Sequence, residues 1–300
     1  MIEHRFAQIF QYNAFTEQPF AGNPAGVVLD AAALDPQTMQ QIARQLNLAE
    51  TAFLTSPTKP DADVRLRWFT PALEVDLCGH ATIAAFTAAA EHGLFPVATD
   101  AERTLRVETL SGVLRIRISR KAGATRVAMQ LPLPSFADIE IDRSSFAALW
   151  NVTEDELSGE WLRHEALDYW YLSVSDRRVL NKLTLNSERL AEIDPRAAFT
   201  FFTTDTIEPQ SDWHLRFFAP FHGVDEDIVT GSAQGPMGLV HLKRFPTQVR
   251  DGWCELRGEQ GDLLGRPGRV SVRVEMTQGI ASDLEIAGSA VRMLEGRIRV

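Results

Sequence analysis

One stretch of this chain occurs twice, as TAFLTSPTKPDADVRLRWFTPALEVD at residues 51–76 and as TFFTTDTIEPQSDWHLRFFAPFHGVD at residues 200–225. At an offset of 149 residues the two copies align without a gap and are identical at 11 of 26 positions. An ungapped match at half the chain length is hard to explain by chance between unrelated strand-rich segments. It indicates a duplication, and therefore two similar halves related by a pseudo-two-fold axis.

Each copy predicts the same order of elements. Alternating polar and apolar residues predict strands at 50–55 and 64–69 in the first copy, and at 199–204 and 213–218 in the second. Proline ends the second strand of each pair, because it cannot continue a hydrogen-bonded ladder. Further strands are expected at 105–109, 113–119, 127–131, 270–274, 284–288 and 291–300.

An apolar helix is expected after the strands of each copy, at 79–90 and at 231–242. The first is apolar nearly all round and the second is mostly apolar, which is typical of buried helices. We therefore expect an α+β fold of two pseudo-symmetric halves, each a β-sheet or barrel wrapped around a central helix. Outer helices are expected at 36–46 and 143–150. The expected division is 1–133 for the first half, 134–285 for the second, and 286–300 for a C-terminal strand returning to the first.

Composition narrows the class of protein. The 300 residues carry a net charge of −10 and a pI of about 5.2, which disfavours binding to nucleic acid. No apolar run reaches the roughly 18 residues of a membrane span, and the N-terminus lacks a signal core, so we expect a cytoplasmic protein. Two cysteines without metal-ligand spacing give no support to a metal site, and no nucleotide-binding motif is present.

Two residues are candidates because of their positions before the buried helices. The repeat aligns Cys78 with Asp227, and the first N–H groups of a helix form a site for anions. A cysteine there is expected to have a lowered pKa. Opposed helix starts could hold a carboxylated substrate between acid and base groups. Alternatively, Cys78 is a small buried apolar residue and Asp227 an ordinary helix cap.

Three further residues are candidates with structural alternatives. Glu50 is either a proton carrier or a solvated turn carboxylate. His80 is either a proton shuttle at the helix start or a capping histidine. Asn23 lies in a Gly-Asn-Pro sequence typical of a tight turn. The glycine-rich run 258–268 predicts a loop, from which Gln260 or Gly261 could contact substrate.

Several motifs in order resemble the PhzF family, the phenazine-biosynthesis-like group related in fold to diaminopimelate epimerase. They are FAGNPAGVV at 20–28, AETAF at 49–53, FTPALEVDLCGHAT at 69–82 and EDIVTGSA at 226–233. The resemblance covers essentially the whole chain. The chain departs from the family pattern at Asn13, where an acidic residue is common, at Ile228, where proline is usual, and at Gln234, where histidine is common.

The resemblance implies a cofactor-independent isomerase that acts on a small carboxylated substrate in the cleft between its halves, and it implies a homodimer. It implies Glu50 as the main proton carrier, with His80 and Asp227 in the same site. Substrate contacts are expected from a second set of residues: Asn23, Cys78, Gly79, Gly231 and Ser232. Two alternatives stay open: a carboxylate-binding or interaction protein without catalysis, and a thiol-based racemase or epimerase that uses Cys78.

Overall fold

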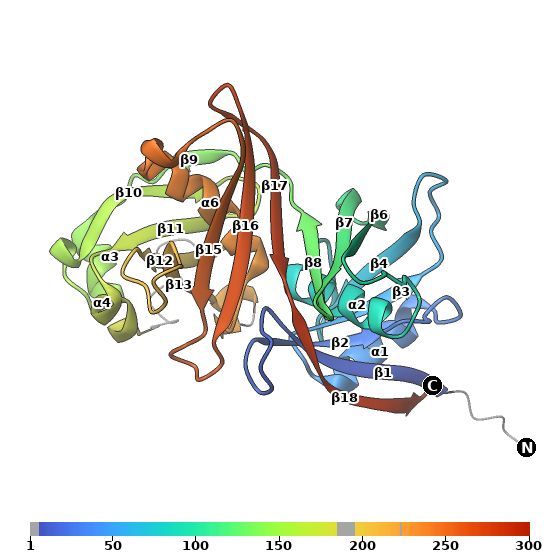
Figure 1. Cartoon of the computed structure of the whole chain (residues 1–300). Helices are drawn as coiled ribbons and strands as arrows, with labels where there is room; N and C mark the ends of the chain where they lie inside the picture. Colours follow the sequence, from blue (N-terminus) through green and yellow to red (C-terminus); the bar gives the residue numbers. More distant parts are fainter. Residues whose placement is uncertain (1–5, 185–195, 223) are drawn as a thin grey trace, which may run out of the picture. The chain divides into compact units, whose positions relative to one another are not determined.

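The computed structural model describes residues 6–184, 196–222 and 224–300, and the chain forms two compact units (Figure 1). One unit comprises Met1–Leu131 with Glu285–Val300, and the other comprises Pro132–Leu284. The expected division at residues 133/134 and 285/286 lies within two residues of these bounds. The first five residues, which contributed to the expected cytoplasmic location, lie outside the described part of the chain.

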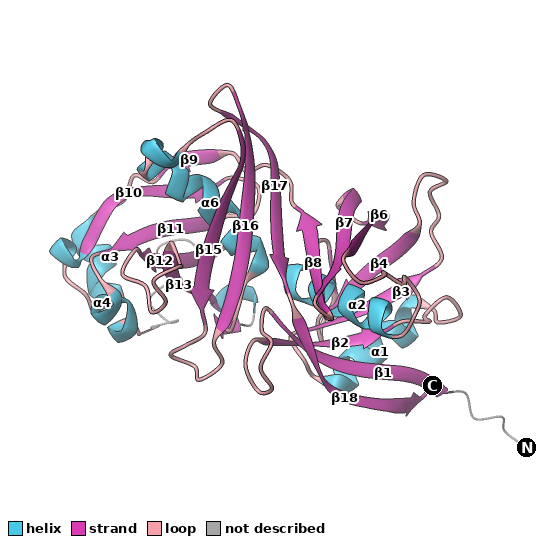
Figure 2. Cartoon of the chain, in the orientation of Figure 1, coloured by secondary structure: helices cyan, strands magenta, loops and turns pink. Residues whose placement is uncertain are grey.

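Strands predominate in the first unit (Figure 2). They pair in the succession β1–β2, β2–β3 parallel, β3–β4, β4–β6 parallel, β6–β7 and β7–β8, with β5 added to β4. The last strand of the chain pairs antiparallel with β1, and the end of β17 pairs with β8. The strands are β1 (Phe6–Ala14), β2 (Asn23–Val28), β3 (Glu50–Thr55), β4 (Val64–Phe69), β5 (Glu74–Val75), β6 (Ala101–Thr109), β7 (Gly112–Lys121), β8 (Ala124–Gln130), the part of β17 (Ile280–Gly288) from Glu285 onward, and β18 (Ala290–Arg299).

Two helices complete the first unit. Helix α2 (Gly79–Glu91) is buried from Gly79 to Ala89 and packs against β1, β2, β3 and β8, as its uniformly apolar sequence predicts. Helix α1 (Pro36–Leu46) has the predicted bounds. Asp35 caps it by accepting from the Thr38 N–H at 2.8 Å, and its apolar face packs on β3 and β4.

The second unit repeats this strand order. Its pairings run β10–β11, β11–β12 parallel, β12–β13, β13–β15 parallel and β15–β16, with β14 added to β13 and β9 to β10. The strands are β9 (Phe136–Asp138), β10 (Leu157–His164), β11 (Tyr169–Val174), β12 (Ala198–Thr203), β13 (Trp213–Ala219), β14 (Val224–Asp227), β15 (Gly252–Gln260) and β16 (Gly268–Thr277). The same strand order in both units is the outcome that a duplication predicts.

Three α-helices lie in the described part of the second unit. Helix α6 (Gly231–Arg244) is its buried helix, and Figure 1 shows it behind β15 and β16. Helix α3 (Arg143–Leu149) matches the predicted outer helix. Helix α4 (Arg177–Lys182), which was not predicted, lies between β11 and β12 in the chain, as α1 lies between β2 and β3. Short 3₁₀ turns occur at Glu154–Glu156, Pro220–His222 and Pro246–Gln248.

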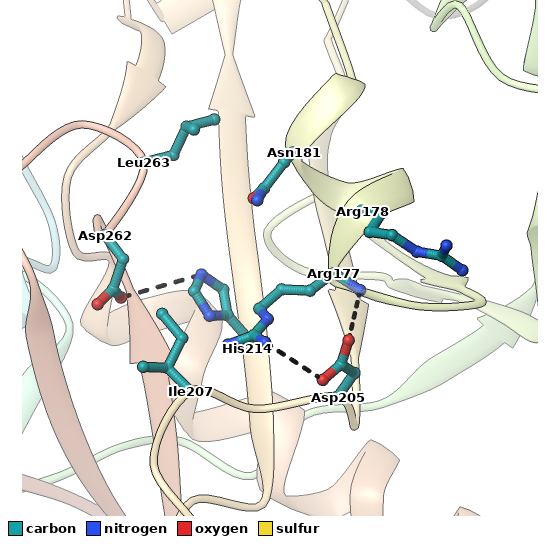
Figure 3. Close-up of a pocket in the computed structure, with 8 residues that line it drawn as sticks. All are labelled: Arg177, Arg178, Asn181, Asp205, Ile207, His214, Asp262 and Leu263. Carbon is teal, nitrogen blue, oxygen red and sulfur yellow. Dashed lines mark hydrogen bonds and ion pairs between the residues drawn. The ribbon is translucent and has the colours of Figure 1, made fainter.

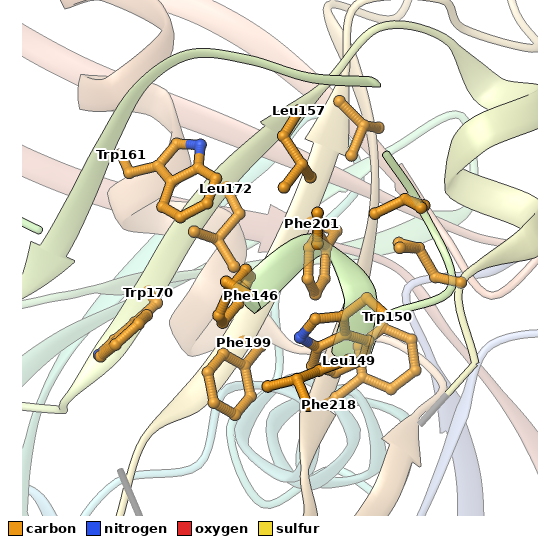
Figure 4. Close-up of a cluster of buried hydrophobic side chains, with 14 of the residues drawn as sticks. Phe146, Leu149, Trp150, Leu157, Trp161, Trp170, Leu172, Phe199, Phe201 and Phe218 are labelled. Atoms are coloured by element: carbon orange, nitrogen blue, oxygen red, sulfur yellow. The ribbon is translucent and has the colours of Figure 1, made fainter. Parts of the chain in front are cut away.

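An aromatic core holds the outer helices on the second unit (Figure 4). Phe146, in the middle of α3, and Trp150, its C-cap, pack against rings from β12 and β13, and the Trp150 and Phe201 ring centres lie 4.5 Å apart. Full burial of such side chains stabilises the fold by several kcal/mol each, about 3–5 kcal/mol when judged by truncation. Within the described ranges, no helix has the length and apolar character needed to cross a membrane.

Candidate active site

Three predicted site residues come together at the start of α2 in the first unit. Glu50 is the first residue of β3, Cys78 is the N-cap of α2, and His80 is the second residue of that helix. The Glu50 Oε2 and His80 Nε2 atoms are 3.2 Å apart, and the Cys78 Sγ and His80 Nδ1 atoms are 3.5 Å apart. Glu50 is therefore not a freely solvated carboxylate, since its side chain is only 21% exposed.

Burial and the neighbouring charges set the protonation of this cluster. Burial lowers the pKa of His80, but Cys78 and the Glu50 carboxylate raise it, and the net pKa lies well above the ordinary value. Burial raises the pKa of the Cys78 thiol, and Glu50 raises it further. The expected lowering of the Cys78 pKa is therefore wrong. With Cys78 as a thiol, the Glu50 carboxylate is the charged neighbour that favours an imidazolium at His80.

The imidazole lies between its two partners. Its Nδ1 faces the thiol, and its Nε2 lies at ion-pair distance from the carboxylate without hydrogen-bond geometry, so the three groups are close enough to hold or pass a proton after a small adjustment. Their ligand atoms lie within 4.8 Å of one another, a donor set that zinc could accept. However, the two ring nitrogens face different partners rather than one common centre, which favours acid–base chemistry.

Side-chain hydrogen bonds hold the backbone at the start of α2, but no side chain bonds its first N–H groups. Thr82 donates its hydroxyl to the Cys78 carbonyl at 2.6 Å, and Trp68 Nε1 donates to the Thr82 oxygen at 3.2 Å. No side chain caps the helix, so the first N–H groups, from Gly79 onward, are available to an anion. The buried Asn23 lies on β2, two residues before Ala25, which is the register partner of Glu50.

Asp227 occupies a different position from the one expected. The N-cap of α6 is Thr230, so Thr230 and not Asp227 is the counterpart of Cys78 by helix position. Asp227 is the last residue of β14, three residues earlier, because the 149-residue offset fails just after the repeated stretch. Residues 228–230 form a turn into which the Asp227 carboxylate folds back.

The Asp227 carboxylate is held by that turn. Its Oδ1 accepts from the Ile228 N–H at 2.9 Å, and its Oδ2 accepts from the Thr230 hydroxyl at 2.6 Å. The next two residues, Gly231 and Ser232, begin α6, whose N-terminus also lacks a side-chain cap. The starts of both helices were predicted to offer N–H groups to the substrate. In the second unit, Asp227 bonds Thr230, the residue that precedes α6.

Some residues near the second helix start were missed or interpreted differently. The Tyr169 hydroxyl lies 3.4 Å from the Ser232 hydroxyl, and nothing in the local pattern of β11 distinguishes this tyrosine from a core residue. Gln260, interpreted as a possible substrate contact, instead bonds Asp227 and Thr230. Gln234, one of the departures from the family pattern, is fully buried and bonds Gln260.

A separate polar pocket of about 390 Å³ lies in the second unit beside α4 (Figure 3). His214 lies at its centre, between Arg177 on one side and Asp262 on the other. These charges already have partners: His214 binds the buried Glu259 at 3.1 Å, Arg177 pairs with Asp205, and Asp262 pairs with an arginine of β16. None of the predicted site residues lines it, so we do not place the reaction there.

Comparison with known proteins gives relatives over the whole length. The model of the PhzC-PhzF family, described as phenazine biosynthesis-like protein, matches residues 12–296. The uncharacterized isomerase YfhB of Bacillus subtilis is 31% identical, with 95% of this chain and 96% of that protein covered. The trans-2,3-dihydro-3-hydroxyanthranilate isomerase of Pseudomonas aeruginosa is 30% identical, with 98% and 99% covered.

Solved structures agree with these relatives. A PhzF-family phenazine biosynthesis protein of Bacillus anthracis has a TM-score of 0.87 at 31% identity, and the match covers 99% of this chain and all of the other. A hydroxyproline epimerase of Agrobacterium vitis has a TM-score of 0.61 at 14% identity, covering 100% of this chain and 93% of the other, which shows a shared fold. The expected resemblance and the α+β epimerase-like fold are thus confirmed.

Proposed function

This chain belongs to the PhzC-PhzF family of phenazine biosynthesis-like proteins, and on that premise we propose that it is a cofactor-independent isomerase acting on a small carboxylated substrate. Relatives along its full length are named isomerases, which supports the reaction class. The observation that carries the proposal is the 3.2 Å approach of the Glu50 carboxylate to the His80 imidazole at an uncapped helix start. This arrangement combines a base, an acid and an anion site.

In the proposed reaction, Glu50 removes a proton from the substrate and later returns one. Glu50, as a carboxylate, takes a proton from a substrate carbon, and the electron pair left behind moves toward the substrate's unsaturated or carboxyl group. The N–H groups at the start of α2 stabilise the negative charge that develops there. Glu50, whose side chain is 21% exposed, then gives this proton, or one exchanged with water, to a different carbon on the same side of the substrate. His80 keeps a positive charge beside Glu50, as the raised pKa of His80 requires.

The role of the second unit is part of the proposal. We assign Asp227 to the same reaction, with Gly231 and Ser232 as further contacts for the substrate's polar groups. Support comes from the family resemblance and from the uncapped N-terminus of α6 next to the Asp227 turn. That the two helix starts act on one substrate stays a prediction, as does the homodimer.

The thiol-based alternative has less support. A cysteine base acts as a thiolate, whereas burial and Glu50 raise the pKa of Cys78. A two-thiol mechanism also needs a second cysteine at the other helix start, and Thr230 stands there.

The test is a ranking of three variants on a panel of small carboxylic acids that includes trans-2,3-dihydro-3-hydroxyanthranilate. Glu50→Gln should lower turnover by about 10²- to 10⁴-fold, since it removes the base while keeping the shape. Cys78→Ala should lower turnover least, and the loss of turnover in His80→Asn should lie between those of Glu50→Gln and Cys78→Ala. An enzyme that survives Glu50→Gln and loses activity with Cys78→Ala would be a thiol-based racemase. Binding of an acid without turnover by the wild type would indicate a non-catalytic binding protein.

A further inference from the structure

We propose that Gln260 is a positioning residue that orients the Asp227 carboxylate through the hydroxyl of Thr230. The inference rests on the proposed function for the role of Asp227, but the hydrogen bonds that carry it belong to the second unit alone. Gln260 is the last residue of β15 and is 1% exposed. A buried amide needs all its hydrogen bonds satisfied, so its partners show what it fixes.

Three bonds join Gln260 to the Asp227–Thr230 turn. Its Oε1 accepts from the Thr230 N–H at 2.9 Å, while its Nε2 donates to the Asp227 carbonyl at 3.0 Å and to the Thr230 hydroxyl oxygen at 3.1 Å. The orientation of the amide is settled by the backbone, because the Thr230 N–H can only donate. One side chain therefore holds both ends of the turn.

The bond from Gln260 to the Thr230 oxygen leaves the Thr230 hydroxyl proton for Asp227. The Thr230 hydroxyl has a single proton, and since its oxygen accepts from Gln260, that proton is free to go to Asp227 Oδ2, 2.6 Å away. The other carboxylate oxygen accepts from the Ile228 N–H. An ionised carboxylate only accepts, so Thr230 donates to it. Gln260 holds the Thr230 oxygen in place for this bond, which stabilises the ionised carboxylate and fixes its orientation.

A second buried amide holds Gln260 in turn. Gln234, on α6, donates to Gln260 Oε1 at 3.2 Å and accepts from Trp213 Nε1 at 2.7 Å. With this bond, both donors and both lone pairs of the Gln260 amide have partners. The glutamine at position 234, where the family commonly has histidine, therefore takes part in the same network.

The first unit lacks this arrangement. By the pairing of β4 with β6 and of β13 with β15, the counterpart of Gln260 is Thr109. Thr109 bonds Gly112 and Ser111 within its own hairpin turn. The amide network is thus specific to the unit that carries Asp227, rather than a general device for holding a helix start in this fold.

The experiment compares Gln260→Glu and Gln260→Met in the full-length protein, with Gln248→Met as a control at an exposed glutamine of the same unit, whose amide bonds His241. Gln260→Glu keeps the shape, removes both donors and adds a negative charge. We expect kcat to fall about 10- to 100-fold with a smaller change in KM, and the acid limb of the pH–rate profile to move to higher pH. Gln260→Met should act in the same direction, and the control should change neither.

A second readout does not depend on turnover. Titration of the Asp227 carboxyl by carbon NMR should show a higher pKa in both Gln260 variants than in the wild type, and an unchanged pKa in Gln248→Met. Folded Gln260 variants with unchanged Asp227 titration and unchanged pH profile would overturn the proposal. A wild-type level of turnover in Glu50→Gln would instead overturn the proposed function and leave the Asp227 titration as it is.

Discussion

The pKa of a residue at a buried helix start depends on whether the helix N-terminus or burial has the larger effect. A helix N-terminus favours a nearby negative charge by about 0.3–1 kcal/mol, and up to about 2 kcal/mol when partly buried. Full burial can shift a pKa by 3–5 units in the opposite direction. At Cys78 burial and Glu50 outweigh the helix, so the thiol is retained. The residue types of the site could be predicted from the sequence, whereas this balance depends on how deeply α2 is enclosed.

The raised pKa of Cys78 predicts slow alkylation. Iodoacetamide reacts with the thiolate, and both burial and the raised pKa deplete that form. We expect Cys78 in the native protein near neutral pH to be modified at least about tenfold more slowly than in the urea-denatured chain. Mass spectrometry of tryptic peptides measures both rates. Equal rates in the two states would mean that Cys78 is a reactive thiolate.

The raised pKa of His80 predicts a pH-dependent contribution to stability. In the unfolded chain histidine titrates near about 6.5, so stability gained from the charged ring is complete below that pH and is lost as the pH rises toward the folded-state value. Glu50→Gln removes one cause of the shift. Its cost in unfolding free energy should therefore be larger at about pH 6 than at about pH 9.5.

Urea denaturation at the two pH values measures this difference. Glu74→Gln is the control, because it removes a carboxylate paired with Arg67, which does not titrate in this range. A Glu50→Gln cost that is the same at both pH values, or greater at the higher one, would rule out an imidazolium–carboxylate pair.

At the scale of elements, the buried helices were predictable and the exact start of α6 was not. Mostly apolar sequence identified α2 and α6, because such segments need surrounding strands to cover them. The ungapped repeat then placed Asp227 at the helix start. It could not reveal that three residues separate Asp227 from α6, because a turn held by side-chain bonds leaves no periodic signal.

The close approach of β15 to α6 predicts an intolerant glycine. A Cβ atom at Gly258 would lie 1.9 Å from Gln234 Oε1 and 2.3 Å from Trp213 Nε1, where these two groups form their hydrogen bond. Gly258→Ala should cost about 1–3 kcal/mol or more of unfolding free energy. Gly296→Ala is the control, since its Cβ would meet nothing closer than 4.0 Å. Equal stability of the two variants would contradict this packing.

At the scale of the whole molecule, the duplication could be predicted because long-range strand order follows from copied sequence. The repeated sequence contains β3, β4 and β5 in the first unit and their counterparts β12, β13 and the start of β14 in the second. Both units have the same strand order. Helix α4 was missed because its six residues are too few to show a helical period. The network of Gln234 and Gln260 was also missed, since it joins residues from separate elements.

Because β18 pairs with β1, we expect removal of β18 to destabilise the first unit. β18 pairs with β1 along nine residues, from Phe6 to Ala14 of β1, and so covers one edge of the first unit. Ending the chain at Ser289 would expose that edge and the apolar residues beside it, which favours unfolding and edge-to-edge association. We expect a lower melting temperature and aggregates in size-exclusion chromatography. A truncated chain with unchanged melting temperature and elution would show that β18 is dispensable.

The central claim, that Glu50 carries the proton, is tested most directly by hydrogen exchange into the substrate in deuterated water. The wild type, given the acids of the panel, should introduce deuterium at the substrate carbon that loses or gains a proton, as seen by NMR or mass spectrometry. Glu50→Gln should bind the same acid with similar affinity and introduce deuterium about 10²-fold or more slowly. Deuterium incorporation by Glu50→Gln at the wild-type rate would contradict the account.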